Sequence, residues 1–222
     1  MKKFIPTFFT LANICCGFMA VAVGDLKIGS FFLIIAIIFD TWDGMLARAL
    51  NVQSEMGKEL DSLADMISFG IAPAYLYTLI APVDHWFIYV APLFFVIGAA
   101  LRLAKFNLLP SSKHFYGLPV PFATLFLVGI FIGVQYERNL FLNTIDSTAV
   151  YFLIPFVLMM LMLSNMRMFS LKNLDKGLAR NFFPILCIVI FFMMLIVDFR
   201  IAFSGIVLVY IFLSFLERIF VS

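Results

Sequence analysis

Long runs of mostly apolar residues follow one another along the whole 222-residue chain and constrain its fold more than any other feature. A helix that crosses the hydrocarbon core of a bilayer needs about 20 such residues, with a range of about 17–25. The runs are continuous and do not alternate between apolar and polar positions, which favours helices over barrel strands. The sequence therefore predicts an all-α, polytopic membrane helical bundle. About eight spans are expected, over residues 8–23, 28–51, 59–80, 86–103, 119–135, 150–164, 181–197 and 201–216.

The composition excludes several classes of protein. Apolar residues make up 64% of the chain and charged residues 13%, whereas soluble domains have about 45–50% and about 25%. A water-soluble globule and a disordered chain are therefore excluded. The formal net charge of +2 is too small for an electrostatic grip on phosphate backbones, so we expect membrane lipids and no nucleic acid as partners.

The distribution of lysine and arginine predicts the orientation, because cytoplasmic loops carry an excess of both. Twelve of the fifteen lie at the two termini, near the second and third spans, or near the loops after spans four and six. These twelve are Lys2, Lys3, Arg48, Lys58, Arg102, Lys105, Lys113, Arg167, Lys172, Lys176, Arg180 and Arg218. Lys27, Arg138 and Arg200 fall on the opposite side. We therefore expect an integral protein of the cell membrane with both termini in the cytoplasm.

Acidic residues gather in one stretch between the second and third predicted spans. Six of the thirteen carboxylates lie within the 26 residues from 40 to 65. They are Asp40, Asp43, Glu55, Glu59, Asp61 and Asp65. A carboxylate at membrane depth costs about 2.5–3.5 kcal/mol on insertion scales, so such groups indicate function. This stretch is therefore the candidate functional site, at the predicted cytoplasmic side.

Helical periodicity, with about 100° of rotation per residue, arranges part of this stretch into two polar stripes. The stripe on the second span holds Asp40, Asp43, Gly44 and Ala47 with Arg48 at its edge, and the stripe on the third holds Gly57, Asp61 and Asp65. The connecting segment is short. We therefore expect antiparallel neighbouring helices whose stripes face each other.

Four facing carboxylates repel one another unless positive charge lies between them, and Arg48 and Lys58 are too few to balance them. Oxygen ligands without His or Cys favour hard cations such as Mg²⁺, Mn²⁺ or Ca²⁺. Four aspartates can hold two such ions about 3.5–4 Å apart, an arrangement that clamps a phosphoryl group during in-line displacement. The small residues on the stripes fit a ligand that approaches the backbone, although helix packing in membranes uses small residues too.

The spacing Asp40-x2-Asp43-Gly44-x2-Ala47-Arg48-x8-Gly57-x3-Asp61-x3-Asp65 resembles the signature of the CDP-alcohol phosphotransferase family at all eight positions. The wider chain resembles the phosphatidylserine synthase branch of that family in residues 6–17, 58–65, 68–74, 101–107 and 116–121. The departures are Thr7, where the branch usually has Asn, Met45, where relatives are often basic, and Lys105, where Arg is common. They leave the chemistry intact and weaken the assignment of the acceptor alcohol.

The resemblance implies that two metal ions, Mg²⁺ or Mn²⁺, hold the pyrophosphate of a CDP-linked lipid while an alcohol displaces CMP. It makes Asp40, Asp43, Asp61 and Asp65 the metal ligands, and Asp65 also the catalytic base for the incoming hydroxyl. It assigns Gly44, Ala47, Arg48 and Gly57 to CDP binding. Thr10 and Asn13 are candidates for nucleotide contacts or for helix–helix hydrogen bonds. Arg102, Lys105 and Asn107 are candidates for binding the serine carboxylate or lipid phosphate, or for anchoring at anionic lipid.

The implied activity is transfer of a phosphatidyl group from CDP-diacylglycerol to L-serine. Glycerol 3-phosphate or inositol phosphate are alternative acceptors, but their second phosphate would call for a denser basic pocket than Arg102, Lys105 and Lys113 offer. An ion or proton transporter is the alternative from another class. A transporter would explain carboxylates in a membrane, but not their crowding at one cytoplasmic end.

The domain organisation expected from the sequence is a single integral-membrane domain over residues 1–222. Its signature occupies residues 40–65, and the last two helices, 181–216, are peripheral to the catalytic core. The family resemblance also implies a homodimer.

Overall fold

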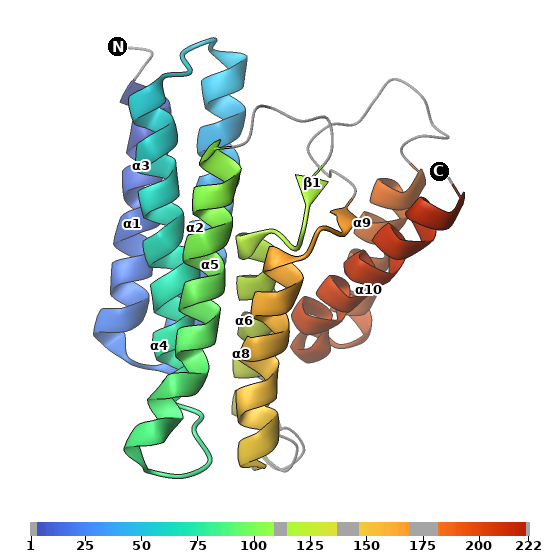
Figure 1. Ribbon diagram of the computed structural model, residues 1–222. Coiled ribbons are helices and arrows are strands. Elements are labelled where there is room, and N and C mark those ends of the chain that lie inside the picture. The colour runs from blue at the N-terminus through green and yellow to red at the C-terminus, as the bar shows by residue number, and fades with distance from the viewer. Residues whose placement is uncertain (1–3, 109–114, 137–146, 169–181, 221–222) are drawn as a thin grey trace.

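The computed structural model describes residues 4–108, 115–136, 147–168 and 182–220 (Figure 1). Within these ranges the chain is helical apart from short connections and one pair of two-residue strands, β1 (Phe115–Tyr116) and β2 (Arg167–Met168). The α-helices are α1 (Phe4–Val23), α2 (Leu26–Ala49), α3 (Glu55–Asp65), α4 (Ala72–Thr78), α5 (Val90–Leu108), α6 (Val120–Tyr136), α8 (Thr148–Leu163), α9 (Phe182–Val197) and α10 (Phe199–Phe220). A π-helix, η1 (Met66–Ile71), joins α3 to α4, and a 3₁₀ turn, η2 (Trp86–Tyr89), precedes α5.

The all-α prediction is confirmed in the described part of the chain, and each predicted span falls on a helical segment. Four helical segments are long and apolar enough to cross a bilayer: Phe4–Val23, Leu26–Ala49, Trp86–Leu108 and Phe199–Glu217. The apolar helices α6, α8 and α9 are shorter. Many large apolar side chains face outward, such as Phe8, Phe192 and Ile196. Exposed apolar surface of this extent suits lipid and not water, so the chain is an integral membrane protein.

Helix α1 is the central support of the first half of the bundle. It packs along α2 and also contacts α3, η1 and α4 (Figure 1). Glycine permits the closest approaches: a Cβ on Gly17 would lie 2.7 Å from Cα of Ser68, and one on Gly29 would lie 2.7 Å from Cδ1 of Leu76. Small residues allow membrane helices to approach each other in this way. The contacts of α1 therefore fix where α2 and α3 stand.

Two prolines interrupt helical hydrogen bonding, and a hydroxyl group from another helix compensates in each case. Proline has no N–H to donate to the carbonyl four residues earlier. For Pro73 that carbonyl belongs to Phe69, and it accepts a hydrogen bond from Oγ1 of Thr124 in α6 (2.8 Å). For Pro155 in α8 it belongs to Tyr151, and it accepts one from the hydroxyl of Tyr77 (3.0 Å). Such substitute donors are what make proline tolerable inside membrane helices.

The π-helix η1 lies directly before Pro73, the second residue of α4. The N–H of Ala72 bonds to the carbonyl of Ile67, five residues back, instead of four. This bond ends one residue before Pro73, which has no N–H to continue either register. The sequence predicted one continuous α-helix over residues 59–80. The structure differs because the hydrogen bonds change from the α register to the π register in the middle of this segment.

The α9–α10 hairpin lies against α6 through α10, at an incline to the other helices (Figure 1). Oγ of Ser204 donates to the carbonyl of Phe126 (3.2 Å), and Gly129 makes room for the Ser204 backbone. Nearer the C-terminus, the ring of Tyr210 stacks on Phe122 with centroids 4.5 Å apart. This hairpin is thus joined to the bundle by direct packing of α10.

Candidate active site

The predicted acidic stripes face one another. Asp40 and Asp43 lie near the end of α2 and are buried, 9% and 4% exposed, and Asp61 and Asp65 lie on α3. One carboxylate oxygen from each of Asp40, Asp61 and Asp65 lies within 4.8 Å of the others. Asp43 lies outside that group of three, although its charge acts on Asp65. The structure therefore brings three of the four predicted carboxylates together and places the fourth beside them.

The backbone explains how the two stripes meet. The connection between α2 and α3 turns at Asn51, which has a positive φ of 52°, and Ser54 then caps α3 by accepting a hydrogen bond from the N–H of Gly57 (3.1 Å). The two helices run antiparallel, as predicted, at the same end of the bundle as the start of α1 (Figure 1). Their backbones do not pack closely along their length, and both rest on α1. The carboxylates thus reach toward each other between helices that a third helix holds.

The donor set fits a hard cation. It consists of carboxylate oxygens alone, which suit Mg²⁺, Mn²⁺ or Ca²⁺. Oδ1 of Asp65 is buried and has no hydrogen-bond partner among the described residues. A buried oxygen of this kind is costly unless a ligand satisfies it. Nζ of Lys58 donates to the carbonyl of Asn107 in α5 (3.1 Å), so this amine is engaged by α5.

The four residues predicted to bind CDP lie on the same two helices. Gly44 has open space beside it: a Cβ there would meet Nη1 of Arg48 at 3.7 Å and no nearer described atom. Arg48 is exposed and Ala47 half-buried in the last turns of α2. Gly57 has a local structural role too, since a Cβ there would lie 3.0 Å from the Oγ of its capping Ser54.

Thr10 and Asn13 in α1 differ in how their side chains are satisfied. Oγ1 of Thr10 donates to the carbonyl of Pro6 within its own helix (3.1 Å). Asn13 is fully buried, and neither its amide nitrogen nor its amide oxygen has a hydrogen-bond partner among the described residues. Its main-chain carbonyl accepts a hydrogen bond from Ser68 in η1 (2.8 Å). The Asn13 side chain therefore retains unused hydrogen-bonding capacity beside η1, whereas the Thr10 hydroxyl already donates a hydrogen bond within its own helix.

Arg102, Lys105 and Asn107 make separate contacts along helix α5. Lys105 donates to the side chain of Asn165 (3.1 Å), and Asn107 is tied to Ser62 of α3 (2.9 Å). Arg102 points inward and is 9% exposed. It makes one long hydrogen bond to the carbonyl of Gly117 (3.4 Å), and its buried Nε has no partner in the described part of the chain.

Arg102 also lies within electrostatic range of Asp65 and of Tyr210. A buried guanidinium with little local compensation favours an anionic partner. Of the three basic or polar candidates on α5, Arg102 is the buried one, and it lies within electrostatic range of Asp65.

The structure adds supports that the sequence did not reveal. Ser68 and Thr124 are fully buried and bond to groups in or beside η1, which begins directly after Asp65. Ser68 lies in the stretch 68–74 that resembles the family branch. For Thr124 the sequence signal is Pro73, which predicts a freed carbonyl at Phe69 without indicating which distant residue bonds to it.

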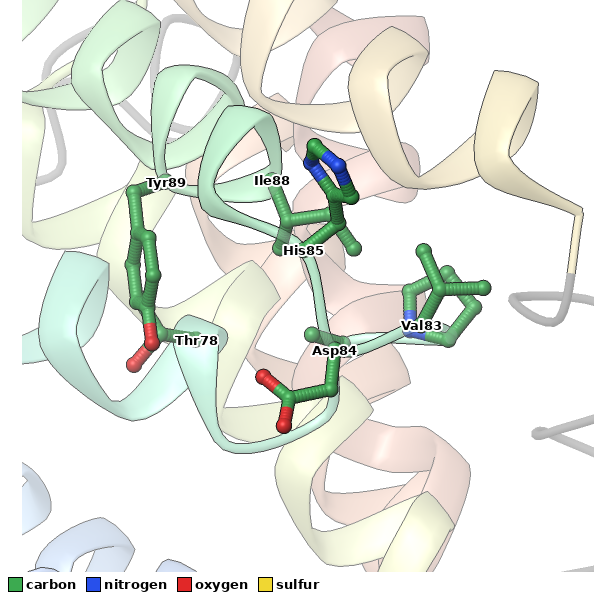
Figure 2. A pocket seen from close by; sticks show the side chains of 8 residues that line it. Thr78, Val83, Asp84, His85, Ile88 and Tyr89 are labelled. Atoms are coloured by element: carbon green, nitrogen blue, oxygen red, sulfur yellow. The ribbon is translucent and has the colours of Figure 1, made fainter.

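Two cavities in the described part of the chain lie away from the acidic site. A cavity of about 250 Å³ sits at the connection between α4 and α5 (Figure 2). Its labelled lining includes Thr78, Asp84, His85 and Tyr89. Thr78 is thirteen residues beyond Asp65, which is roughly 20 Å along a helix. A second, wholly apolar cavity lies between α6, α8 and α10. Neither contains a residue predicted for the site.

Comparison with known proteins adds a family to this geometry. The family model described as CDP-alcohol phosphatidyltransferase matches residues 3–162, which is most of the chain and includes every predicted site residue. The chain belongs to this family. The members of this family are enzymes of phospholipid biosynthesis, so the chain is a CDP-alcohol phosphatidyltransferase. The family generally uses divalent cations.

Curated relatives narrow the comparison. The chain is 38% identical over 131 residues to a CDP-diacylglycerol–serine O-phosphatidyltransferase of Bacillus subtilis, covering 57% of this chain and 74% of that protein. It is 38% identical over 125 residues to a protein of the same description from Methanocaldococcus jannaschii, covering 56% and 59%. An archaetidylserine synthase of Methanothermobacter thermautotrophicus is 32% identical over 142 residues, covering 60% of each chain. The alignments thus span less than two thirds of the archaeal relatives.

Proposed function

We propose that the protein transfers a phosphatidyl group from CDP-diacylglycerol to L-serine, giving phosphatidylserine and CMP. The observation that carries the proposal is the convergence of carboxylate oxygens from Asp40, Asp61 and Asp65 on a chain of this family. The names of the relatives support serine as the acceptor and a CDP-linked lipid as the donor.

Asp40, Asp43, Asp61 and Asp65 would hold the divalent cations, Mg²⁺ or Mn²⁺, with two ions proposed. When bound, such cations neutralise the negative charge on the pyrophosphate and on the phosphoryl group that is being transferred. The aspartates would hold the cations near the ends of α2 and α3. The all-oxygen donor set and the unpartnered Oδ1 of Asp65 support this assignment.

Asp65 is the proposed general base. The serine hydroxyl oxygen forms a bond to the phosphorus of the phosphatidyl group, the bond from that phosphorus to the oxygen of CMP breaks, and the hydroxyl proton moves to Asp65. A carboxylate can accept this proton if the alcohol lies within hydrogen-bond reach. An aspartate beside cations is a weak base, so stabilisation of the phosphoryl charge would supply most of the rate.

The CDP moiety would lie along the glycine and alanine side of the two stripes. Gly44, Ala47 and Gly57 leave the backbone accessible, and the exposed Arg48 can reach a phosphate oxygen. Asn13, with its unsatisfied buried amide, is the better candidate on α1 for a further polar contact. Thr10 is kept as a weaker one because its hydroxyl is already bonded to Pro6.

Arg102 is the proposed partner of the serine carboxylate. It is a buried cation near Asp65 with a nitrogen that lacks a partner among the described residues. A guanidinium can hold a carboxylate through two parallel hydrogen bonds. Lys105 and Asn107 are proposed to have structural roles. Lys105 joins α5 to Asn165, just after α8, and Asn107 joins α5 to Ser62 of α3.

The site is proposed to face the cytoplasm, in the cell membrane, with both termini on the same side. The concentration of lysine and arginine near the α2–α3 end supports this orientation. We further propose one domain over residues 1–222 with α9 and α10 peripheral to catalysis, which fits a family match that ends at residue 162. A homodimer is proposed from the family resemblance.

The test is release of CMP from CDP-diacylglycerol by purified protein in detergent, across a panel of alcohols. We expect release with L-serine and Mg²⁺ or Mn²⁺, and none after chelation. Release that depends on glycerol 3-phosphate or inositol phosphate but not on serine would overturn the acceptor. Full turnover in chelator-treated protein would overturn the cation site.

A further inference from the structure

The π-helix η1 stands between the acidic stripe of α3 and the packed part of α4. It begins at Met66, directly after Asp65, and ends at Ile71. A π-turn holds one more residue than an α-turn. It therefore rotates everything before it relative to everything after it by roughly 100°. The direction of Asp61 and Asp65 relative to the rest of the bundle depends on this extra residue.

The π-turn lies beside a proline and is hydrogen-bonded to two other helices. Pro73 removes the donor that would otherwise bond to the carbonyl of Phe69. Oγ1 of Thr124 takes that place at 2.8 Å, from a residue that is fully buried in α6. On the opposite side, Oγ of Ser68 bonds to the carbonyl of Asn13 in α1 at 2.8 Å. Two hydroxyl groups therefore tie η1 to two different helices.

Pro155, inside α8, supplies a comparison. Tyr77 donates to the carbonyl of Tyr151, which Pro155 frees in the same way. Tyr77 lies near the end of α4, twelve residues beyond Asp65, which is roughly 18 Å along a helix. The bond is of the same chemical kind and also buried, but it supports no residue of the acidic site. Any effect special to Thr124 must therefore come from its place beside η1.

We propose that Thr124 is a positioning residue for the cation site: its bond to the Phe69 carbonyl holds the π-turn that aims Asp61 and Asp65 at Asp40. Thr124 touches no predicted ligand itself and acts through η1. This inference rests on the proposed function insofar as it takes the aspartates to be cation ligands. It adds to that function a residue of α6 outside the family signature.

The experiment compares three purified full-length variants with the wild type. Thr124→Val removes the hydroxyl at nearly constant shape, Thr124→Ser restores a hydroxyl, and Tyr77→Phe is the matched control at the other proline. Mn²⁺ binding is measured directly by electron paramagnetic resonance without substrate. The Mn²⁺ midpoint for CMP release and the KM for serine are measured beside it, with the thermal unfolding midpoint in chelator as the measure of stability.

We expect Thr124→Val to weaken Mn²⁺ binding by roughly tenfold, as loss of a group that orients metal ligands does. Thr124→Ser should recover most of it, and Tyr77→Phe should lower the unfolding midpoint without changing Mn²⁺ binding. The KM for serine should change much less than the Mn²⁺ midpoint. If Thr124→Val does not fold, Ser68→Ala tests the same turn from the α1 side, with the same expected loss.

Unchanged Mn²⁺ binding in a folded Thr124→Val protein, beside normal binding in the wild type, would overturn this inference and leave the proposed function standing. Equal weakening in Thr124→Val and Tyr77→Phe would overturn it as well, since the effect would then be general destabilisation. A wild type that binds no Mn²⁺ would overturn the cation site and this inference together.

Discussion

Asp65 is the residue at which the structural and chemical arguments meet. It shares an oxygen cluster with Asp40 and Asp61, has a buried oxygen without a partner among the described residues, and is followed at once by the π-turn. The combination separates it from Glu59, which is exposed one and a half turns earlier on the same helix.

Replacing Asp65 with Asn should lower the rate of CMP release by roughly 10²–10⁴-fold, the range that a positioned base contributes. The amide keeps the shape but cannot take the proton. Binding of CDP-diacylglycerol should remain, which can be followed by equilibrium binding. Glu59→Gln removes a carboxylate from the exposed face of α3 and should leave turnover near that of the wild type. Wild-type turnover in Asp65→Asn would remove it from catalysis.

Arg102 and Lys105 permit a paired comparison on one helix. Because the buried Arg102 is the proposed carboxylate partner, Arg102→Lys should raise the KM for serine by roughly tenfold or more, the worth of a charge-assisted hydrogen bond. Lys105→Gln loses an exposed contact to Asn165 and should change that KM little. Steady-state kinetics with varied serine measures both. The reverse order of effects would place the acceptor at the exposed face of α5.

At this scale the sequence predicted what local periodicity determines. The positions of Asp40, Asp61 and Asp65 on facing stripes follow from spacing within single helices, and they converge as expected. The different contacts of Arg102 and Lys105 lie beyond that periodicity, because residues three apart fall on nearly the same face of α5. Thr124 could not be found in this way, because its partner lies 55 residues away in sequence.

Among the helices, the two prolines show one rule applied twice. Each leaves a carbonyl without its helical donor, and a hydroxyl from a distant helix bonds to it. From sequence, the prolines indicate where bonds are missing. They do not indicate whether the helix responds with a kink or with a π-turn, because that depends on which donor is near. The rotation of α3 relative to α4 about the helix axis could therefore not be predicted from the sequence.

A double-mutant cycle tests the rule. Pro73→Ala supplies an N–H that can bond to the Phe69 carbonyl, so Thr124→Val should be less costly in that background than in the wild type. We expect a coupling of about 0.5–3 kcal/mol, the range for residues that share a partner. Shifts of the thermal unfolding midpoint in chelator measure it. Strictly additive shifts would mean that the two residues do not serve the same carbonyl.

For the molecule as a whole, the acidic site stores repulsion that a bound cation relieves. Three carboxylates crowd within 4.8 Å on helices that rest mainly on a third helix. Removal of charge repulsion favours the folded state, and a ligand that binds only that state stabilises it further. The stability of the bundle should thus depend on divalent cations.

Addition of Mn²⁺ at about 100 times its dissociation constant should stabilise the fold by about 2.7 kcal/mol. For a chain of this length that is a rise of roughly 5–10 °C in the unfolding midpoint. Asp61→Asn should abolish most of the rise and, because one charge is gone, should raise the midpoint in chelator. Thermal unfolding in detergent with and without Mn²⁺ checks both. An equal rise in Asp61→Asn would locate the stabilising cation elsewhere.

The substitute donors at Pro73 and Pro155 carry a consequence for how this protein can diverge. A chain that loses the hydroxyl at position 124 while keeping proline at 73 has an orphaned main-chain oxygen in its interior, and one that loses both has none. Related sequences should accordingly exchange the two positions as a linked pair, as they should Tyr77 with Pro155. Comparison of many homologues would reveal these pairs as correlated substitutions between residues remote in the chain.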